Sequence, residues 1–190
     1  MANLIYMANM SLDGYTEDKD GKYDWTEPSE EYFRFITDLV RAMHTHLYGR
    51  RMYQTMMVWE TDPNLAAQSP LLHDFAEVWQ AADKIVYSRT LETISTRRTQ
   101  LERTFDPQAI RQLKAAGEHD LLIGGPELAA HAFRAGLIDE CQLFLAPILL
   151  GGGKSALPDN VRMELELLAE RRFRNGTVFL RYRTRQGGVT

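Results

Sequence analysis

The chain has 190 residues, a length that suits one domain with a substantial core, and we expect residues 1–190 to form that single domain. Its hydrophobic content of 44% and charged content of 25% are typical of a soluble globular protein. With 22 basic and 26 acidic residues the net charge is -4, which excludes a general attraction to nucleic acid or acidic membranes.

The cysteine and histidine content further limits the classes of protein to which the chain can belong. Cys141 is the only cysteine, so no intrachain disulfide can form, which fits a reducing cytoplasm. The N-terminus has no basic region followed by an apolar core, and no apolar stretch reaches the roughly 18 residues of a membrane span. The histidines show no metal-ligand spacing with one another or with Cys141. We expect a cytoplasmic protein without a metal, a membrane anchor or a nucleic-acid partner.

The first half of the chain alternates strand and helix patterns. In chain order we expect a strand over 3–10, a loop over 11–25, a helix over 29–43, a strand over 46–48 and a helix that opens at 49–51 and runs through 57. The loop over 11–25 is long for a compact domain, and loops of that length are more often functional than idle.

The second half continues the alternation and closes with a hairpin. We expect a loop over 62–70, helices over 71–82, 107–116 and 127–135, and strands over 84–87, 120–123, 141–150 and 163–167. Asp106 and Pro107 suit the N-cap and first position of their helix. Asn175-Gly176 is typical of a hairpin turn. The pattern predicts an α/β fold with a mainly parallel central sheet and a C-terminal antiparallel hairpin.

The apolar run over 120–123 ends in a pair of glycines, Gly124 and Gly125, directly before Pro126. Glycine lets the backbone turn sharply and leaves no Cβ to obstruct an approaching ligand. Pro126 suits the first position of a helix, where its missing N–H would have no partner. Free N–H groups and the positive end of the helix dipole meet at such a junction, so the pattern predicts a phosphate-binding turn.

Two further strand ends carry arginine. Gly49-Arg50-Arg51 stands at a strand-to-helix junction, where the guanidinium groups either clamp phosphate oxygens or lie solvated on a helix surface. Ser88 and Arg89 follow the strand over 84–87, at the sheet edge where open α/β sheets bind ligands, unless they form an ordinary polar loop.

Two loops have more than one interpretation. Asp13 follows the first strand, and it either orients a substrate or caps a turn. The run over 151–155 has the sequence Gly-Gly-Gly-Lys-Ser, as at the end of a P-loop, but Ile148 stands where that pattern needs glycine. We reject an ATP-binding P-loop and expect a flexible connection after a core strand.

Four strand-end motifs occur in one order along the chain. They are Ser-Leu-Asp-Gly at 11–14, Gly-Arg-Arg-x-Tyr at 49–53, Ile-Gly-Gly-Pro-Glu-Leu at 123–128, and Leu-Ile-Asp-Glu at 137–140 leading into Leu-Ala-Pro-Ile-Leu-Leu-Gly-Gly at 145–152. This set resembles the dihydrofolate-reductase-like superfamily over about residues 3 to 184. It looks closest to the branch that contains the reductase domain of the bifunctional riboflavin-biosynthesis deaminase-reductase, as a stand-alone domain. The resemblance implies a single-domain, three-layer fold.

The resemblance also implies NADPH bound along the carboxyl edge of the sheet, at three matching turns. The implied cofactor-binding positions are Gly49, Arg50, Arg51, Met52, Ser88, Arg89, Gly124, Gly125, Pro126, Glu127 and Leu128. In the family the first turn contacts the cofactor phosphates, the second holds the adenosine 2′-phosphate, and the glycine pair holds the pyrophosphate. Arg89 favours NADPH over NADH, since a guanidinium suits the additional phosphate.

The substrate side is implied by a second match. The segment over 25–30, Trp-Thr-Glu-Pro-Ser-Glu, resembles the Trp-x-x-Pro-x-Asp/Glu segment whose acid binds the pterin ring in dihydrofolate reductases. Asp13, Trp25 and Glu30 are therefore candidate substrate-binding residues. Glu30 is also the candidate catalytic residue, since either it or water would donate the proton. The alternative for Glu30 is a first-turn acid that stabilises the helix dipole.

These matches imply an NADPH-dependent oxidoreductase that transfers hydride to a small heterocyclic substrate, pterin- or pyrimidine-like. Two alternatives stay open: the 5-amino-6-ribosylaminouracil phosphate reductase of riboflavin biosynthesis, and an NADPH-binding protein without turnover. Relatives in this branch often dimerise, so a homodimer formed through the sheet edges or the C-terminal hairpin is a candidate assembly.

Overall fold

The computed structural model describes residues 1–25 and 29–185 of the chain. The strands are β1 (Leu4–Ser11), β2 (Tyr15–Glu17), β3 (Met43–Gly49), β4 (Asp83–Tyr87), β5 (Thr99–Glu102), β6 (Asp120–Gly124), β7 (Glu140–Ala146), β8 (Lys154–Ser155), β9 (Glu164–Arg172) and β10 (Val178–Arg185). The helices are α1 (Glu30–Arg41), α2 (Arg50–Met56), α3 (Val58–Thr61), α4 (Pro63–Ala67), α5 (Pro70–Ala81), α6 (Pro107–Ala116) and α7 (Pro126–Arg134). Within these ranges, no helix has the length and apolar character needed to cross a membrane.

Eight of the strands form one sheet in the order β5-β4-β3-β6-β1-β7-β10-β9. Along this order, each strand from β5 to β7 runs parallel to the next. The strand β10 runs antiparallel to both of its neighbours, β7 and β9. The predicted mainly parallel sheet with a C-terminal antiparallel hairpin is therefore confirmed. Parallel order brings the carboxyl ends of β4, β3, β6, β1 and β7 to one edge, where α/β sheets bind their ligands.

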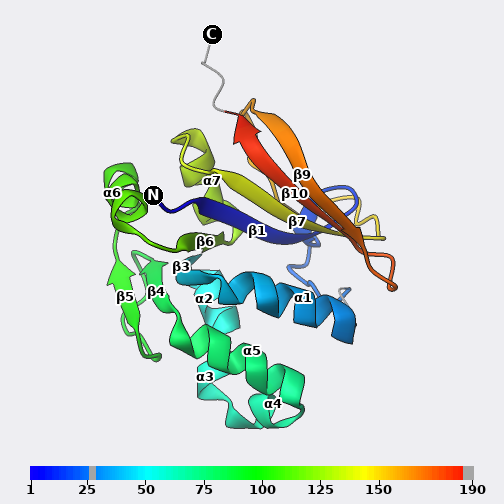
Figure 1. Ribbon diagram of the computed structural model, residues 1–190, viewed down its shortest axis with the longest axis horizontal. Coiled ribbons are helices and arrows are strands. Elements are labelled where there is room, and N and C mark those ends of the chain that lie inside the picture. The colour runs from blue at the N-terminus through cyan, green and yellow to red at the C-terminus, as the bar shows by residue number, and fades with distance from the viewer. Residues whose placement is uncertain (26–28, 186–190) are drawn as a thin grey trace.

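Helices cover both faces of this sheet, as Figure 1 shows. On one face, α6 and α7 pack against the sheet, and Ala129 of α7 is buried in the same cluster as Tyr6. On the other face, α1, α2 and α5 enclose a second cluster that contains Val40, Tyr48 and Trp79. Each of these five helices buries apolar side chains on its sheet side, which produces the predicted three-layer arrangement.

Local capping explains where the predicted helices begin. The Ser29 side chain accepts a hydrogen bond from the Tyr32 N–H directly before α1. Asp106 accepts from the Gln108 N–H, and Pro107 occupies the first turn of α6. These caps pair N–H groups that have no partner inside a helix, so the starts of α1 and α6 follow from local sequence.

The structure adds elements where the sequence predicts none, and the added strands depend on pairing with distant residues. The strand β2 forms inside the expected loop over 11–25, since it pairs with β8 from the run over 151–155. The strand β5 has only four residues and no apolar run, but it extends the sheet beside β4. The helix α4 lies inside the expected loop over 62–70, where Asp62 caps the Asn64 N–H and the helix packs against α5.

Several helices and strands begin or end at other residues than the sequence predicts. The helix α1 ends at Arg41 and β3 begins at Met43, because Met43 is buried in a cluster with Ile5 and Leu122. The strand β7 ends at Ala146 rather than at 150, since Pro147 follows and has no N–H for the ladder. The strand β9 continues to Arg172, because β10 pairs with it along that length.

His46 in β3 is fully buried, and both ring nitrogens have partners. Nε2 lies 3.0 Å from the Met43 carbonyl oxygen, and Nδ1 lies 3.0 Å from the Tyr48 hydroxyl. Burial is the main cause that lowers the pKa of His46 to about 4. The neutral ring therefore donates from Nε2 to the carbonyl and accepts the Tyr48 hydroxyl at Nδ1.

Acid should consequently destabilise the fold. The unfolded chain protonates His46 near pH 6.5 and the folded chain only near pH 4, so this stability is complete above pH 6.5 and is lost as the pH falls toward 4. We expect the free energy of unfolding to drop by about 2 kcal/mol between pH 7.5 and pH 5 in urea titrations. His46→Gln should be less stable at pH 7.5 and less sensitive to pH. Equal pH dependence in the two proteins would contradict this assignment.

Candidate active site

The three turns predicted to bind phosphate lie side by side at the carboxyl edge of the sheet. They follow β4, β3 and β6, which are adjacent strands. Gly49 at the end of β3 is in register with Tyr87, the residue before Ser88, and Tyr48 is in register with Gly124. The tertiary structure thus brings together residues from three separate parts of the chain.

The starts of α2 and α7 form a cradle between these strand ends, and glycines at 49, 124 and 125 let the backbones approach closely there. A Cβ added to Gly49 would lie 3.9 Å from Leu128 Cβ, and one added to Gly125 would lie 3.4 Å from Met52 Cβ. Gly125 has φ 90° and ψ 126°, a conformation that only glycine adopts readily. A Cβ on Gly124 would lie 3.1 Å from Tyr48 Cε1. The first-turn N–H groups of α7 have no partner inside the helix, so this junction holds the backbone donors that a phosphate site requires.

The second turn is shaped by its own hydrogen bonds. Ser88 Oγ accepts from the N–H groups of Thr90 and Leu91, so this hydroxyl stabilises the turn. Arg50 donates to Thr90 Oγ1 over 3.0 Å and connects α2 to this turn. Arg89 is exposed beside it. The structure thus leaves the Arg89 guanidinium at the surface of the turn, where it can meet a phosphate.

The Asp13 carboxylate accepts hydrogen bonds from its own turn and from the loop that follows β7. Oδ1 accepts from the Ser11 hydroxyl at 2.6 Å and from the Leu150 N–H at 3.1 Å, and Oδ2 accepts from the Gly151 N–H at 2.7 Å. The Ser11 hydroxyl and these amides lower the pKa of Asp13 to about 2. Asp13 therefore joins the ends of two loops, which fits the turn-capping alternative, and it is not among the residues that line the nearby cavity.

A cavity of about 280 Å³ opens at the ends of β1 and β7, on the α1 side of the sheet. It is lined by Asn9, Asp24, Trp25, Tyr32, Phe144, Ala146, Pro147, Asn175 and Thr177. The lining comes from β1, the loop before α1, α1 itself, β7 and the hairpin turn. In the sheet, β1 is the neighbour of β6, and β6 is the neighbour of β3. The cavity at the end of β1 therefore lies beside the cradle, which is formed at the ends of β3 and β6.

Trp25 is a predicted substrate residue, and it lines this cavity. Its Nε1 is buried and has no hydrogen-bond partner among the described residues. The Tyr32 hydroxyl donates to Asn9 Oδ1 over 2.8 Å, and burial raises the pKa of Tyr32. The cavity therefore combines aromatic walls with polar groups, the composition typical of a pocket for a small heterocycle.

Glu30, the predicted substrate-binding and catalytic residue, lies outside this cavity. Its side chain is 70% exposed, and Oε1 is 2.6 Å from Nη2 of Arg34, one helical turn away. It is the first residue of α1 and does not line the cavity. This placement fits the first-turn alternative, and the substrate role of Glu30 stays a prediction. The intervening residues 26–28 of the matched segment lie outside the described residues.

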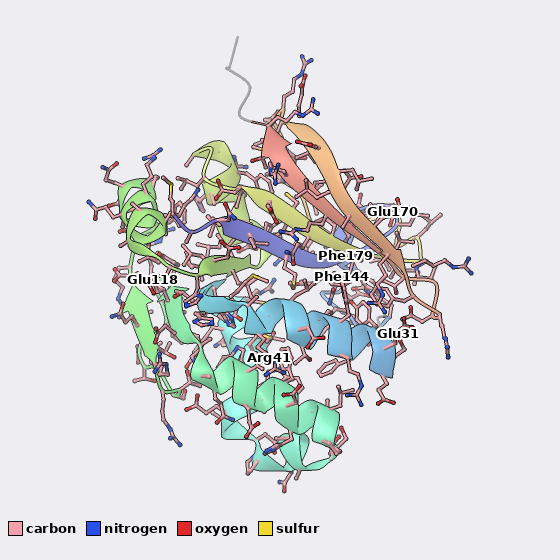
Figure 2. All side chains as sticks on the ribbon, in the orientation of Figure 1. Glu31, Arg41, Glu118, Phe144, Glu170 and Phe179 are labelled. Carbon is pink, nitrogen blue, oxygen red and sulfur yellow. The ribbon has the colours of Figure 1, made fainter. Side chains whose placement is uncertain are left out.

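The next residue, Glu31, holds the hairpin against α1. Its Oε1 accepts from Arg171 over 2.8 Å. The Arg171 guanidinium stacks 4.8 Å from the Phe35 ring and 5.0 Å from the Phe173 ring. Figure 2 shows Glu31 at the N-terminal end of α1. This contact positions the hairpin turn over the cavity.

Sequence reasoning missed most of the cavity lining. Asn9 points to the α1 face because the residues of β1 alternate between the two faces of the sheet, and Tyr32 lies on the buried stripe of α1. Only the pairing of β10 with β7 brings Asn175 and Thr177 to the same place. The described residues contain no group of three or more His, Cys, Asp or Glu side chains that could hold a metal ion.

The sequence profile of the RibD C-terminal domain matches residues 2–179. The chain belongs to the RibD C-terminal domain family. YyaP of Bacillus subtilis is 28% identical over 182 residues, which cover 91% of this chain and 90% of that protein. The riboflavin biosynthesis protein RibD of Mycobacterium tuberculosis is 30% identical over 155 residues, which cover 78% of this chain but only 43% of that RibD.

Solved structures show the same fold. A Shewanella protein named for riboflavin biosynthesis has a TM-score of 0.75 at 23% identity, over 98% of this chain and 100% of that chain. The Thermotoga maritima diaminohydroxyphosphoribosylaminopyrimidine deaminase and 5-amino-6-(5-phosphoribosylamino)uracil reductase has a TM-score of 0.64 at 14% identity, over 96% of this chain and 56% of that one. Dihydrofolate reductase from Enterococcus faecalis, complexed with NADP(H), has a TM-score of 0.63 at 15% identity, over 96% of both chains. This member of the RibD C-terminal domain family therefore has the dihydrofolate-reductase-like fold of these structures.

Proposed function

We propose that this chain binds NADPH in the cradle and transfers its hydride to a small heterocycle, pyrimidine- or pterin-like, in the cavity. The observation that carries the proposal is the register of three phosphate-compatible turns at one sheet edge, beside a cavity at the neighbouring strand ends. NADPH supplies the hydride, and the protein supplies orientation and a pocket that excludes water.

The cradle suits a dinucleotide diphosphate. Gly124 and Gly125 keep the turn free of side chains, and the first-turn N–H groups of Glu127 and Leu128 have no partner inside α7. We assign the diphosphate to 124–128 and the neighbouring phosphate contacts to 49–52. We assign the adenosine 2′-phosphate to 88–89, with Arg89 as its cation.

The cavity suits a flat ring with polar edges. Trp25, Tyr32 and Phe144 supply apolar contact, and Asp24 is the acidic residue among the lining residues. A carboxylate accepts hydrogen bonds from ring N–H groups and so orients a pyrimidine or pterin. We therefore assign to Asp24 the orienting contact that the sequence pattern suggested for Glu30.

A matched pair of variants tests this assignment. Asp24→Asn keeps the size of the side chain but removes an acceptor charge, so KM for the heterocycle should rise about tenfold with NADPH affinity unchanged. Glu30→Gln removes the same charge from the exposed surface and should change KM less than twofold, since its salt bridge with Arg34 is exposed. Steady-state kinetics measure both. A larger effect from Glu30→Gln would restore the role predicted from the sequence.

Calorimetry and turnover test the function as a whole. Purified protein should bind NADPH at or below millimolar concentration and oxidise it in the presence of a member of a panel of pterins and ribosylaminopyrimidines. Failure to bind NADPH would refute the proposal. Binding without oxidation of NADPH across the panel would instead favour an NADPH-binding protein without turnover.

The second candidate is the 5-amino-6-ribosylaminouracil phosphate reductase reaction of riboflavin biosynthesis. The 30% identity to a RibD over 155 residues favours it. Complementation of a strain that lacks this reductase decides between this substrate and other heterocycles.

We also propose a cytoplasmic homodimer. The edge strand β9 exposes Leu165 and Leu167, and its outer backbone groups have no strand partner within the described residues. Exposed apolar side chains on an open strand edge favour pairing with a second copy. Light scattering coupled to size-exclusion chromatography measures the mass, and a monomer at micromolar concentration would refute the dimer.

A further inference from the structure

A chain of four charged side chains crosses the cradle. Arg51 Nη1 lies 3.7 Å from Glu17 Oε2, and Lys154 Nζ lies 3.8 Å from Glu17 Oε1. Lys154 Nζ also lies 3.0 Å from Oε1 of Glu127, in the first turn of α7. The four residues come from α2, β2, β8 and α7, so the chain connects the small β2–β8 sheet to both helix starts.

The backbone fixes the position of Lys154. A Cβ added to the preceding residue, Gly153, would lie 1.9 Å from the Glu17 carbonyl oxygen, so β2 and the loop before β8 approach closely. The Asp13 carboxylate holds the start of the same loop at Gly151, and the Ala156 N–H donates to the Gly14 carbonyl after β8. The run over 151–155 is therefore anchored on both sides, unlike the flexible connection expected from its glycines.

We propose that Lys154 is a ligand of the cofactor diphosphate. This inference rests on the proposed function, because it places the diphosphate at the start of α7. In the cofactor-free protein, the carboxylates of Glu17 and Glu127 hold the ammonium beside the cradle. When the diphosphate arrives, the flexible lysine stem turns the ammonium from Glu127 to a phosphate oxygen, where a charge-assisted hydrogen bond forms.

The position of Glu127 requires such a cation. Its carboxylate stands beside the proposed anion site, and a bare carboxylate there would repel a diphosphate. The Lys154 ammonium, 3.0 Å from Glu127 Oε1, holds the pKa of Glu127 below its usual range. Glu127 therefore competes with the diphosphate for Lys154, and its removal should strengthen cofactor binding.

Calorimetry with NADPH and with NADH distinguishes this role from others, because both cofactors carry the diphosphate and only NADPH carries the 2′-phosphate. Lys154→Ala should weaken both by the same factor, about tenfold, while Lys154→Arg retains most of the affinity. Arg89→Ala should weaken NADPH alone. Glu127→Gln should tighten both cofactors. Lys22→Ala, which removes an exposed lysine of the neighbouring loop, is the matched control and should change neither.

The outcomes separate the two proposals. Wild-type protein that binds neither cofactor would refute the proposed function and this inference together. Wild-type binding with an unchanged Lys154→Ala affinity, or a loss confined to NADPH, would overturn the role of Lys154 alone. Thermal melting verifies that each variant is folded. If Lys154→Ala does not fold, Glu127→Gln decides, since unchanged or weaker binding by that variant would also overturn the role.

Discussion

Replacing Gly153 by alanine should destabilise the protein by about 3 kcal/mol, through a clash and a strained backbone together. The new Cβ would lie 1.9 Å from the Glu17 carbonyl oxygen and 2.9 Å from backbone atoms of Asp18, so no side-chain rotation can relieve it. Gly153 also has φ 136°, a conformation that alanine rarely adopts. The loss is limited by the contribution of the β2–β8 sheet, because that sheet would detach before the main sheet unfolds.

Gly152→Ala is the matched control for this variant. Gly152 has φ 155°, but a Cβ there meets no atom within 4 Å. It should therefore cost less stability than Gly153→Ala, since only backbone strain remains. Urea titration measures both free energies, and hydrogen exchange at Tyr15 and Glu17 reports the β2–β8 sheet. Equal losses in the two variants would show that the close approach of Gly153 to β2 does not contribute to the free energy of unfolding.

Replacing Gly125 by alanine should weaken NADPH binding about a hundredfold. Gly125 precedes α7 with φ 90°, where alanine is strained, so the turn must shift away from its present geometry. Such a shift misaligns the N–H groups of Glu127 and Leu128, and the loss of two hydrogen bonds to a charged group accounts for a factor of about one hundred. Calorimetry measures the effect on NADPH affinity.

The opposite end of the same helix offers the control. Gly136 follows α7 with φ 62°, and a Cβ there meets no atom within 4 Å. Gly136→Ala should cost about 1 kcal/mol of stability, the usual penalty for a left-handed alanine, and should leave NADPH affinity unchanged. Comparable losses of affinity in both variants would indicate general destabilisation of α7 and not a phosphate site at Gly125.

The Gly153 and Gly125 variants probe the two sides of one cradle. Gly125 shapes its floor at the start of α7, and Gly153 positions the β2–β8 sheet that carries Glu17 and Lys154 beside it. If Lys154 binds the diphosphate, Gly153→Ala should also weaken NADPH binding, because the anchored backbone before Lys154 would be lost. The two variants would then share a binding defect with separate structural causes.

Much of the fold was predictable because its signals are local. The caps at Ser29 and Asp106 and the turn at Asn175-Gly176 act within a few residues, and the structure contains the elements they predict. By contrast, β2 and β5 lack apolar runs and exist through pairing with β8 and β4. No local pattern could reveal them.

The candidate site divides in the same way. The sequence by itself determined the three phosphate-compatible turns, because glycine, proline and arginine at a strand end are local chemical features, and parallel strands bring their carboxyl ends to one edge. Only the tertiary structure decided which side chains line the cavity and that Lys154 lies against Glu127. It also placed Glu30 on the surface with Arg34. Those facts depend on contacts between residues far apart in the chain, which the sheet order and the hairpin pairing establish and which no short motif contains.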